Sequence, residues 1–127
     1  MVCPGFDAEL VAYCLDKGLH IYPGCTTATE YLAAMKFGLE VLKFFPVEPS
    51  GGLEQIRLLS EPFPMFKVMT TGGITLENLG YYLSSPAVCA GGSDYMVKAE
   101  YIDAQDWDTI IDLCQKSLAV TRAAKGR

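Results

Sequence analysis

Residues 40–46 read Glu-Val-Leu-Lys-Phe-Phe-Pro, a short apolar run that holds one lysine and ends at a proline. β-Branched and aromatic residues favour strands, and proline cannot donate to a sheet ladder, so the pattern predicts a buried strand over residues 41–45. Alternation along a strand places Lys43 and Phe45 on the same face. A charged side chain inside such a strand is costly, so Lys43 is the first candidate for a functional residue.

Four other apolar runs end in proline or glycine in the same way, at residues 1–3, 19–22, 67–71 and 88–90. Each strand is followed by helix signals. We expect helices after Asp7, after the capping-box pattern Thr27-x-x-Glu30, around residues 53–59, after Thr75 and over residues 106–123. The last of these is expected to bury Trp107, Ile110, Ile111, Cys114 and Leu118.

Strands that alternate with helices predict an α/β fold with a parallel sheet, here with five strand-helix units in one domain over residues 1–127. Two architectures fit: an open doubly wound sheet, or an arc of a (β/α)8 TIM barrel. Length alone favours the open sheet, since a whole barrel has about 200 to 250 residues. The first predicted strand begins abruptly at Met1, as in a chain cut inside a strand, and this favours the arc.

Composition excludes several classes of function. The chain has 127 residues, 10 basic and 15 acidic, with a net charge of −5, so nucleic acid is not an expected partner. No apolar run approaches the roughly 20 residues of a membrane helix and no signal peptide is visible, so we expect a cytoplasmic protein without a membrane partner.

Cysteine and histidine usage argues against disulfides and metal. The five cysteines have no C-x-x-C spacing and are expected to be reduced, small apolar fillers. The single histidine, His20, leaves too few ligands for a zinc site or a Ser-His pair, so no metal and no cofactor are expected.

The position of Lys43 suggests covalent chemistry. Apolar surroundings disfavour the charged form of an amine and free its lone pair for attack on a ketone, which is the first step of Schiff-base formation. The alternative is a lysine near a strand end whose ammonium extends into solvent.

Two glycine pairs follow predicted strands, in Thr71-Gly72-Gly73-Ile74 and Gly91-Gly92-Ser93. Glycine lets the backbone approach an anion closely, and in barrels the last two strand-to-helix loops often bind phosphate. These pairs therefore predict a phosphate site to which Ser93 adds a hydroxyl, although glycine pairs also form plain turns.

Taken together, these motifs resemble a known family. Residues 42–52, with the pattern Leu-Lys-Phe-Phe-Pro-Val-Glu-x-Ser-Gly-Gly, are similar to the signature of the 2-keto-3-deoxy-6-phosphogluconate (KDPG) and 4-hydroxy-2-oxoglutarate (KHG) aldolases. Residues 2–6, 22–24, 71–74 and 91–93 resemble further motifs of that family, in its order. Several motifs over about a hundred residues are more specific than any one of them.

The resemblance implies a fold and a set of site residues. The family is a (β/α)8 barrel and usually a homotrimer, and the five units here would be its strands four to eight. By that resemblance Lys43 forms the Schiff base with pyruvate, and Pro4 and Phe45 line the pyruvate pocket. The expected substrate contacts further along the chain are Thr71, Gly72, Gly73, Gly92 and Ser93.

The resemblance also implies a reaction. A lyase of this kind cleaves KDPG to pyruvate and glyceraldehyde 3-phosphate in the Entner-Doudoroff pathway, or 4-hydroxy-2-oxoglutarate to pyruvate and glyoxylate. In the family a glutamate for proton transfer and an arginine for substrate binding come from the first strands, which this chain lacks. The alternatives are a non-catalytic fragment, or another phosphate-binding barrel in which Lys43 is only electrostatic.

Two positions depart from the family pattern. Thr70 stands where the family usually has proline, and Asp94 replaces a common tryptophan after Gly-Gly-Ser. A carboxylate at position 94 would repel a nearby phosphate, so the phosphorylated substrate is less firmly implied than the lysine chemistry.

Overall fold

The protein has a parallel three-stranded sheet whose strands follow their order in the sequence. The computed structural model describes residues 1–126, and the strands are β1 (Val41–Phe44), β2 (Lys67–Thr70) and β3 (Val88–Gly91). β2 lies in the middle and pairs in parallel with both neighbours, with Lys43 opposite Met69 on the β1 side. The predicted α/β class with a parallel sheet is confirmed.

Helices follow the strand ends as the capping signals predict. The side chain of Asp7 accepts a hydrogen bond from the backbone of Leu10, and Thr27 and Thr75 each form a capping box. The pattern did not predict η1 or α5, which lie in a short connection without helical periodicity. The helices are α1 (Ala8–Asp16), α2 (Ala28–Lys36), α3 (Gly52–Ser60), α4 (Leu76–Leu83), η1 (Asp94–Met96), α5 (Ala99–Asp103) and α6 (Trp107–Lys125).

The first two predicted strands, residues 1–3 and 19–22, are single parallel bridges. Val2 bridges Tyr22, and Gly24 bridges Lys43 at the edge of β1. Proline has no backbone N–H, so Pro4 and Pro23 interrupt the ladder beside these bridges. The prediction of five full strands is therefore wrong for this chain, although the two segments run beside β1 in the expected order.

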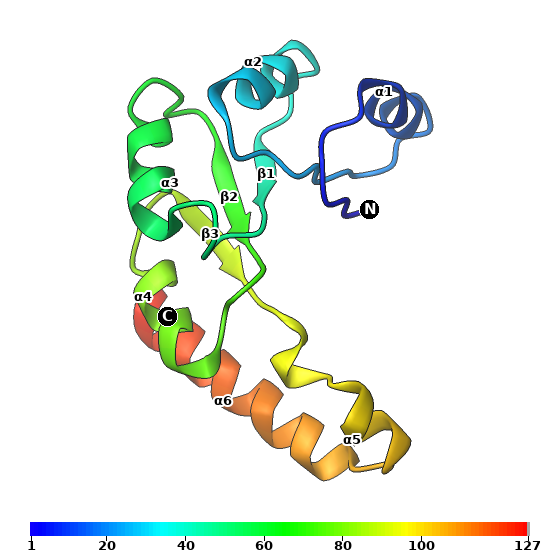
Figure 1. The fold of residues 1–127 in the computed structure, drawn as a ribbon, viewed down its shortest axis with the longest axis vertical. Coiled ribbons are helices and arrows are strands. Elements are labelled where there is room, and N and C mark those ends of the chain that lie inside the picture. Colours follow the sequence, from blue (N-terminus) through cyan, green and yellow to red (C-terminus); the bar gives the residue numbers. More distant parts are fainter. Residues whose placement is uncertain (127) are drawn as a thin grey trace.

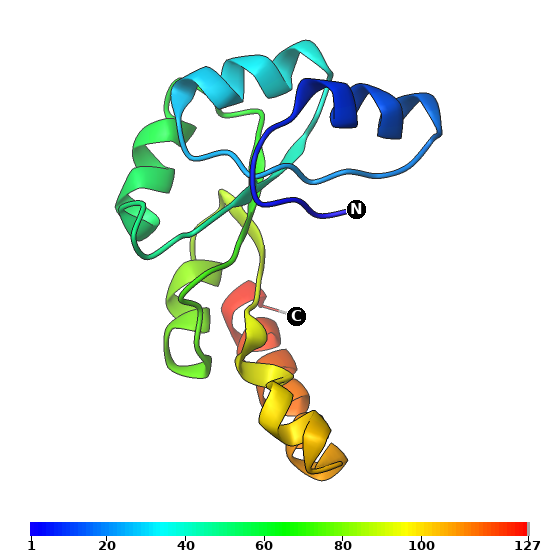
Figure 2. The ribbon, with the colours of Figure 1, turned by 45° about the vertical axis from the view of Figure 1, so that its right-hand side comes forward.

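The sheet has one buried face and one open face. Leu42, Phe44 and Val68 are buried in the core with side chains of the helices. The helices follow one another in an arc along the sheet, from α1 and α2 past α3 to α4 and α6 (Figure 1, Figure 2). The other face, which carries Lys43 and Met69, is only half-buried. A sheet covered by helices on one face alone is consistent with an incomplete barrel.

The long helix α6 turns a different face to the core than the sequence predicts. Trp107 is 53% exposed, and Ile111 and Leu118 are exposed as well. The contact with the rest of the protein is made by Ser117, which is buried, and by Val120, which lies against Gly80 of α4. The prediction of a buried Trp107 is wrong: Trp107 is the first residue of α6, whereas Ser117 and Val120 lie toward the other end of the helix.

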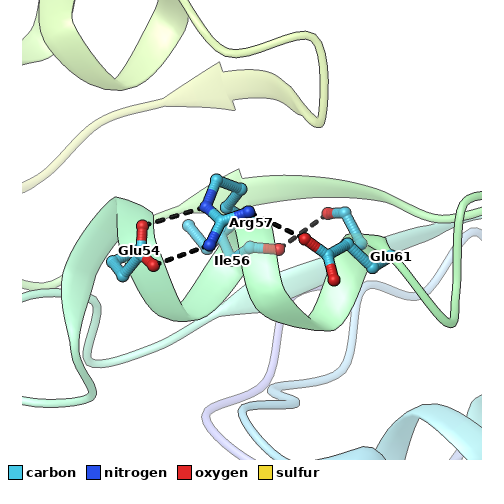
Figure 3. A network of polar contacts seen from close by, with 5 residues as sticks. Glu54, Ile56, Arg57 and Glu61 are labelled. Carbon is cyan, nitrogen blue, oxygen red and sulfur yellow. Dashed lines mark hydrogen bonds and ion pairs between the residues drawn. The ribbon is translucent and has the colours of Figure 1, made fainter.

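The outer surface of α3 carries a charged network that stabilises the helix locally. Figure 3 shows Arg57 between two carboxylates, at 2.8 Å from Glu54 and 2.7 Å from Glu61. The hydrogen bond from Arg57 lowers the pKa of the Glu54 carboxyl. Pairs at this spacing support an exposed helix modestly, and these residues lie on the solvent side of α3.

Cysteines differ in their surroundings. All five are free. Cys14 and Cys25 are fully buried, which agrees with a role as apolar fillers, whereas Cys89 is exposed on β3 and that interpretation is wrong for it. Within the described part of the chain, every helix is too short or too polar to cross a bilayer.

Candidate active site

The predicted site residues follow the carboxyl ends of the strands, along one edge of the sheet. Lys43 is the third residue of β1, and its backbone N–H donates to Pro23 O at 2.9 Å while its carbonyl accepts from Cys25 at 2.9 Å. The lysine is thus fixed between β2 and the Pro23–Cys25 segment. Because the main chain is paired on both sides, only its side chain is free to move.

The amine of Lys43 lies over an aromatic ring. Its Nζ is 4.2 Å from the centroid of the Phe45 ring, close enough for a cation–π contact. Both residues are half-buried, and within residues 1–126 no carboxylate forms a salt bridge with Lys43. The amine thus rests against a ring and takes part in none of the salt bridges of the described residues.

The loop that contains Gly72 and Gly73 packs directly against the end of β1. A Cβ atom on Gly72 would lie 2.9 Å from Cδ2 of Phe45, and φ is +82° at Gly72 and +96° at Gly73. Only glycine tolerates these angles without strain, and only glycine leaves room for the ring. The structure thus brings Phe45 against the glycine loop at Gly72, at the strand edge where the sequence places both.

Thr71 contributes a hydroxyl that has no protein partner. Its Oγ1 atom is the one buried side-chain nitrogen or oxygen atom without a hydrogen-bond partner in residues 1–126. By the alternation of β2, Thr71 follows Met69 on the face that carries Lys43. Buried hydroxyls are nearly always paired, so an unpaired one beside a candidate site is suited to a ligand.

The second glycine loop is tied through the backbone to the end of β2, just before the first glycine loop. The N–H of Gly92 donates to Thr70 O at 3.1 Å. The next residue, Ser93, donates its hydroxyl to Oδ1 of Asp94 at 2.8 Å. This bond keeps the serine hydroxyl occupied and puts a carboxylate next to the loop, which strengthens the argument that Asp94 disfavours phosphate.

Thr70 also differs from the family's usual proline, and the structure gives a reason why it is tolerated. The residue is fully buried, and its hydroxyl donates to Ala90 O at 3.4 Å across the β2–β3 ladder. The polar atom is therefore satisfied inside the core.

Pro4 is separated from Lys43 by one intervening segment of the chain. The N–H of Gly24 donates to Gly5 O at 3.3 Å, and a Cβ on Gly24 would collide with the backbone of Pro4. Gly24 in turn bridges Lys43. The Pro4–Gly5 segment is thus the next one along the edge, with residues 22–25 between it and β1.

A hollow lies on the open face of the sheet, below Lys43. It has a volume of about 290 Å³ and is lined by Tyr22, Val41, Met69, Cys89 and Ala90. Most of its lining is apolar, and Val41 and Met69 lie on the same face as the lysine. In the described residues no group of three or more His, Cys, Asp or Glu side chains is arranged to hold a metal ion.

Two residues beside the glycine loop escaped the sequence analysis. The side-chain amide of Asn78 donates to Gly73 O at 2.9 Å, and the hydroxyl of Tyr82 donates to Glu48 Oε1. The Thr75-x-x-Asn78 spacing is a capping signal that could have indicated the first. Tyr82 follows Leu79 at helical spacing and could have been placed on the inner face of α4.

These features define a class of protein: an α/β chain whose parallel sheet presents a lysine and two glycine loops at the carboxyl ends of its strands. Comparison with known proteins gives the family. Residues 1–113 match the family described as KDPG and KHG aldolase. The chain belongs to this family.

Curated relatives agree with this assignment. The 2-dehydro-3-deoxy-phosphogluconate aldolase of Treponema pallidum is 41% identical over 120 residues, which are 94% of this chain and 57% of that protein. The corresponding aldolase of Haemophilus influenzae is 33% identical over 122 residues, or 96% of this chain and 58% of that protein. This chain therefore spans somewhat more than half the length of the curated relatives it matches.

Solved structures share the fold. The 2-keto-3-deoxy-6-phosphogluconate aldolase of Zymomonas mobilis ZM4 with 3-phosphoglycerate superposes with a TM-score of 0.87 at 30% identity, covering 97% of this chain and 57% of that one. The KDPG aldolase of Legionella pneumophila, with pyruvate captured as a covalent carbinolamine intermediate, gives a TM-score of 0.85 at 31% identity. That match covers 89% of this chain and 55% of the other.

Proposed function

We propose that this chain carries the Schiff-base part of a class I aldolase and that Lys43 is its nucleophile. The observation that carries the proposal is the Lys43 amine, half-buried and 4.2 Å from the centroid of the Phe45 ring, at the edge where the glycine loops meet. An amine held at this place and free of any ion pair can add to a ketone through its lone pair. The pyruvate carbinolamine described for the Legionella pneumophila relative supports covalent chemistry with a keto acid.

The reaction follows from the chemistry of the amine. The lysine nitrogen adds to C2 of the keto acid, and loss of water from the carbinolamine gives a cationic iminium. The C3–C4 bond then breaks, its electron pair moves toward the iminium to form an enamine, and the C4 hydroxyl loses its proton as the aldehyde departs. Protonation at C3 and hydrolysis release pyruvate and restore Lys43.

The substrate we propose is a 2-keto acid with a hydroxyl at C4. In the phosphorylated case KDPG gives pyruvate and glyceraldehyde 3-phosphate, and in the other case 4-hydroxy-2-oxoglutarate gives pyruvate and glyoxylate. Phe45, Thr71 and Pro4 would face the keto-acid end. The distal group would lie at the glycine loops, where Gly72, Gly73 and Gly92 offer backbone donors, and Ser93 would add its hydroxyl by exchanging its bond to Asp94 for one to the ligand.

A second candidate, a fragment that does not turn over, is favoured by the open side of the sheet. β3 is an edge strand, and the hollow beside it is lined by apolar side chains that a whole barrel would cover. We propose that residues 1–127 form one partial barrel domain that corresponds to strands four to eight. The proton-transfer carboxylate and the arginine implied by the family would then have to come from further sequence.

Borohydride trapping with pyruvate tests the lysine chemistry. Reduction of an iminium should add pyruvate covalently to Lys43, read by intact mass and peptide mapping. Lys43→Arg should lose the adduct, whereas Lys36→Arg, on the exposed surface of α2, should keep it. If the adduct formed at another residue, or did not form at Lys43, the assignment of Lys43 as the nucleophile would be rejected.

Turnover separates the two candidates. We expect aldol cleavage by the 127-residue chain to be far slower than by a whole barrel, since proton transfer contributes roughly 10²- to 10⁴-fold. Robust cleavage by the purified chain would contradict the second candidate, a fragment that does not turn over. A cytoplasmic location, a homotrimer at full length and a place in the Entner-Doudoroff pathway stay predictions.

A further inference from the structure

Residues 71–73 extend the β1–β2 pairing beyond the ends of the strands. Thr71 donates its backbone N–H to Phe44 O at 3.1 Å, and in return Val47 donates to Thr71 O at 2.9 Å and Glu48 to Gly72 O at 3.3 Å. The main chain of the first glycine loop is therefore held by the segment that follows Lys43. Any displacement of residues 47–48 is transmitted to the loop.

Glu48 also supports the loop through its side chain. A Cβ on Gly73 would lie 2.9 Å from Cβ of Glu48 and would collide with its Cγ. The aliphatic part of Glu48 thus packs directly under Gly73. If the side chain of Glu48 were not held in place, its carboxylate could approach the loop, and its negative charge would repel an anion bound there.

Tyr82 fixes the carboxylate of Glu48. Its side chain is 2% exposed and belongs to α4, and its hydroxyl donates to Glu48 Oε1. Burial, together with the hydrogen bond from Tyr82 to the Glu48 carboxylate, raises the pKa of the tyrosine, so its hydroxyl stays a donor at neutral pH. From the other side, Gly52 of α3 comes close enough that a Cβ there would lie 3.1 Å from the tyrosine oxygen.

We propose that Tyr82, acting through Glu48, is a positioning residue that sets the affinity of the Gly72–Gly73 loop for a phosphate group. The inference rests on the proposed function, in which this loop receives the distal phosphate of the substrate. Tyr82 touches neither Lys43 nor a bound ligand in this scheme. It holds Glu48, Glu48 supports Gly73, and Asn78 completes the arrangement with its bond to Gly73 O at 2.9 Å.

The neighbouring Tyr81 offers a matched control. It is 62% exposed, and its ring packs edge-on against that of Tyr82 with centroids 5.5 Å apart. Replacing either tyrosine with phenylalanine removes one hydroxyl and keeps the ring. Only the hydroxyl of Tyr82 reaches Glu48, so the pair of variants isolates this one hydrogen bond.

Titration of the ¹⁵N-labelled 127-residue chain with inorganic phosphate tests the proposal, with the Gly72 and Gly73 amide signals as the readout. These amides should shift in the wild type, and Tyr82→Phe should raise the dissociation constant about five- to tenfold, which is less than the full effect of one hydrogen bond to a charged group because Tyr82 acts on the loop only through Glu48. Tyr81→Phe should match the wild type. Glu48→Gln should bind phosphate as tightly as the wild type or up to about fivefold more tightly, because the amide oxygen still accepts the bond while one negative charge beside the loop is removed.

Equal phosphate affinity in Tyr82→Phe and the wild type would overturn the proposal, and so would wild-type Gly72 and Gly73 amides that do not respond. A parallel loss of phosphate and pyruvate affinity would show a merely structural role and would also overturn it. Should Tyr82→Phe fail to fold, Glu48→Ala should bind phosphate more weakly than Glu48→Gln, which has the same charge but keeps an acceptor for Tyr82, and equal affinities in these two variants would overturn the proposal. A missing Lys43 adduct would reject the aldolase chemistry alone, since the phosphate titration does not depend on it.

Discussion

The amine of Lys43 lies 4.2 Å from the centroid of the Phe45 ring, two residues further along the same strand face. The same ring is also the nearest side chain to Gly72 across the sheet edge. One aromatic side chain therefore contacts the nucleophile that we propose and defines the space beside it. Its ring faces the nitrogen on which positive charge would develop in the iminium that we propose.

Phe45→Leu should weaken pyruvate capture. A ring face stabilises a cationic iminium by about 0.5–1 kcal/mol at a partly exposed site, so the pyruvate concentration for half-maximal trapping should rise roughly two- to fivefold. Phe37→Leu is the matched control, because Phe37 packs on Phe6 with centroids 5.9 Å apart, at the end of α2. An unchanged trapping curve for Phe45→Leu would show that the Phe45 ring does not stabilise the iminium.

Gly73→Ala should destabilise the fold. At φ +96° an alanine is strained, and its Cβ would collide with the Glu48 side chain, so we expect a loss of about 1–3 kcal/mol in the free energy of unfolding. Gly5→Ala is the control, since a Cβ there has no neighbour within 4 Å. Urea unfolding of the two variants measures the difference, and equal stabilities would contradict the loop geometry.

Sequence patterns located the helices better than the strands. Capping residues such as Asp7 and Thr75 act through local hydrogen bonds, so their positions could be predicted from sequence spacing alone. Whether residues 1–3 form a strand depends on the neighbours available for pairing. Only one bridge forms there, and no local pattern could have indicated this.

The site also combines features that local sequence determines with features that depend on tertiary packing. The common position of Lys43, Phe45 and the glycine loop could be predicted, because strand alternation puts Lys43 and Phe45 on one face and the glycines follow the end of a neighbouring strand. Tyr82 could not be recognised as functional, because its contact with Glu48 spans 34 positions in the sequence and depends on how α4 packs. The exposed Trp107 has a similar cause: helical spacing gives a face, but the packing partner decides which face is buried.

Alkaline pH should destabilise the protein partly through Cys25. Burial raises the pKa of this thiol from its ordinary value of 9.0 to about 12. The unfolded chain therefore releases the proton first, and the stability that is present below pH 9 is lost as the pH rises toward 12. Cys25→Ala should reduce the slope of unfolding free energy against pH in this window, as measured by urea titrations. The Cys89→Ala control, at an exposed position, should keep the wild-type slope.

Asp94→Asn should strengthen phosphate binding. The substitution removes one negative charge next to the second glycine loop but keeps an oxygen that can accept the hydrogen bond from Ser93. We expect a two- to fivefold gain, on the order of 0.5–1 kcal/mol for one exposed charge, and a gain that shrinks at high salt. The matched control is Asp103→Asn at the end of α5. If both variants gained the same affinity for phosphate, the gain would come from the net charge of the protein and not from the position of Asp94.

Thr71→Val should separate stability from ligand binding. Valine has nearly the same shape as threonine, and the Thr71 hydroxyl is buried without a protein partner, so its removal should leave the unfolding free energy equal or higher. If that hydroxyl serves the keto acid, as we propose, pyruvate trapping at Lys43 should weaken by about five- to tenfold. Thr70→Val is the control with the opposite expected result. The Thr70 hydroxyl donates to Ala90 O at 3.4 Å, so its loss should lower the unfolding free energy. A destabilised Thr71→Val with normal trapping would show that the hydroxyl serves the fold and not the ligand.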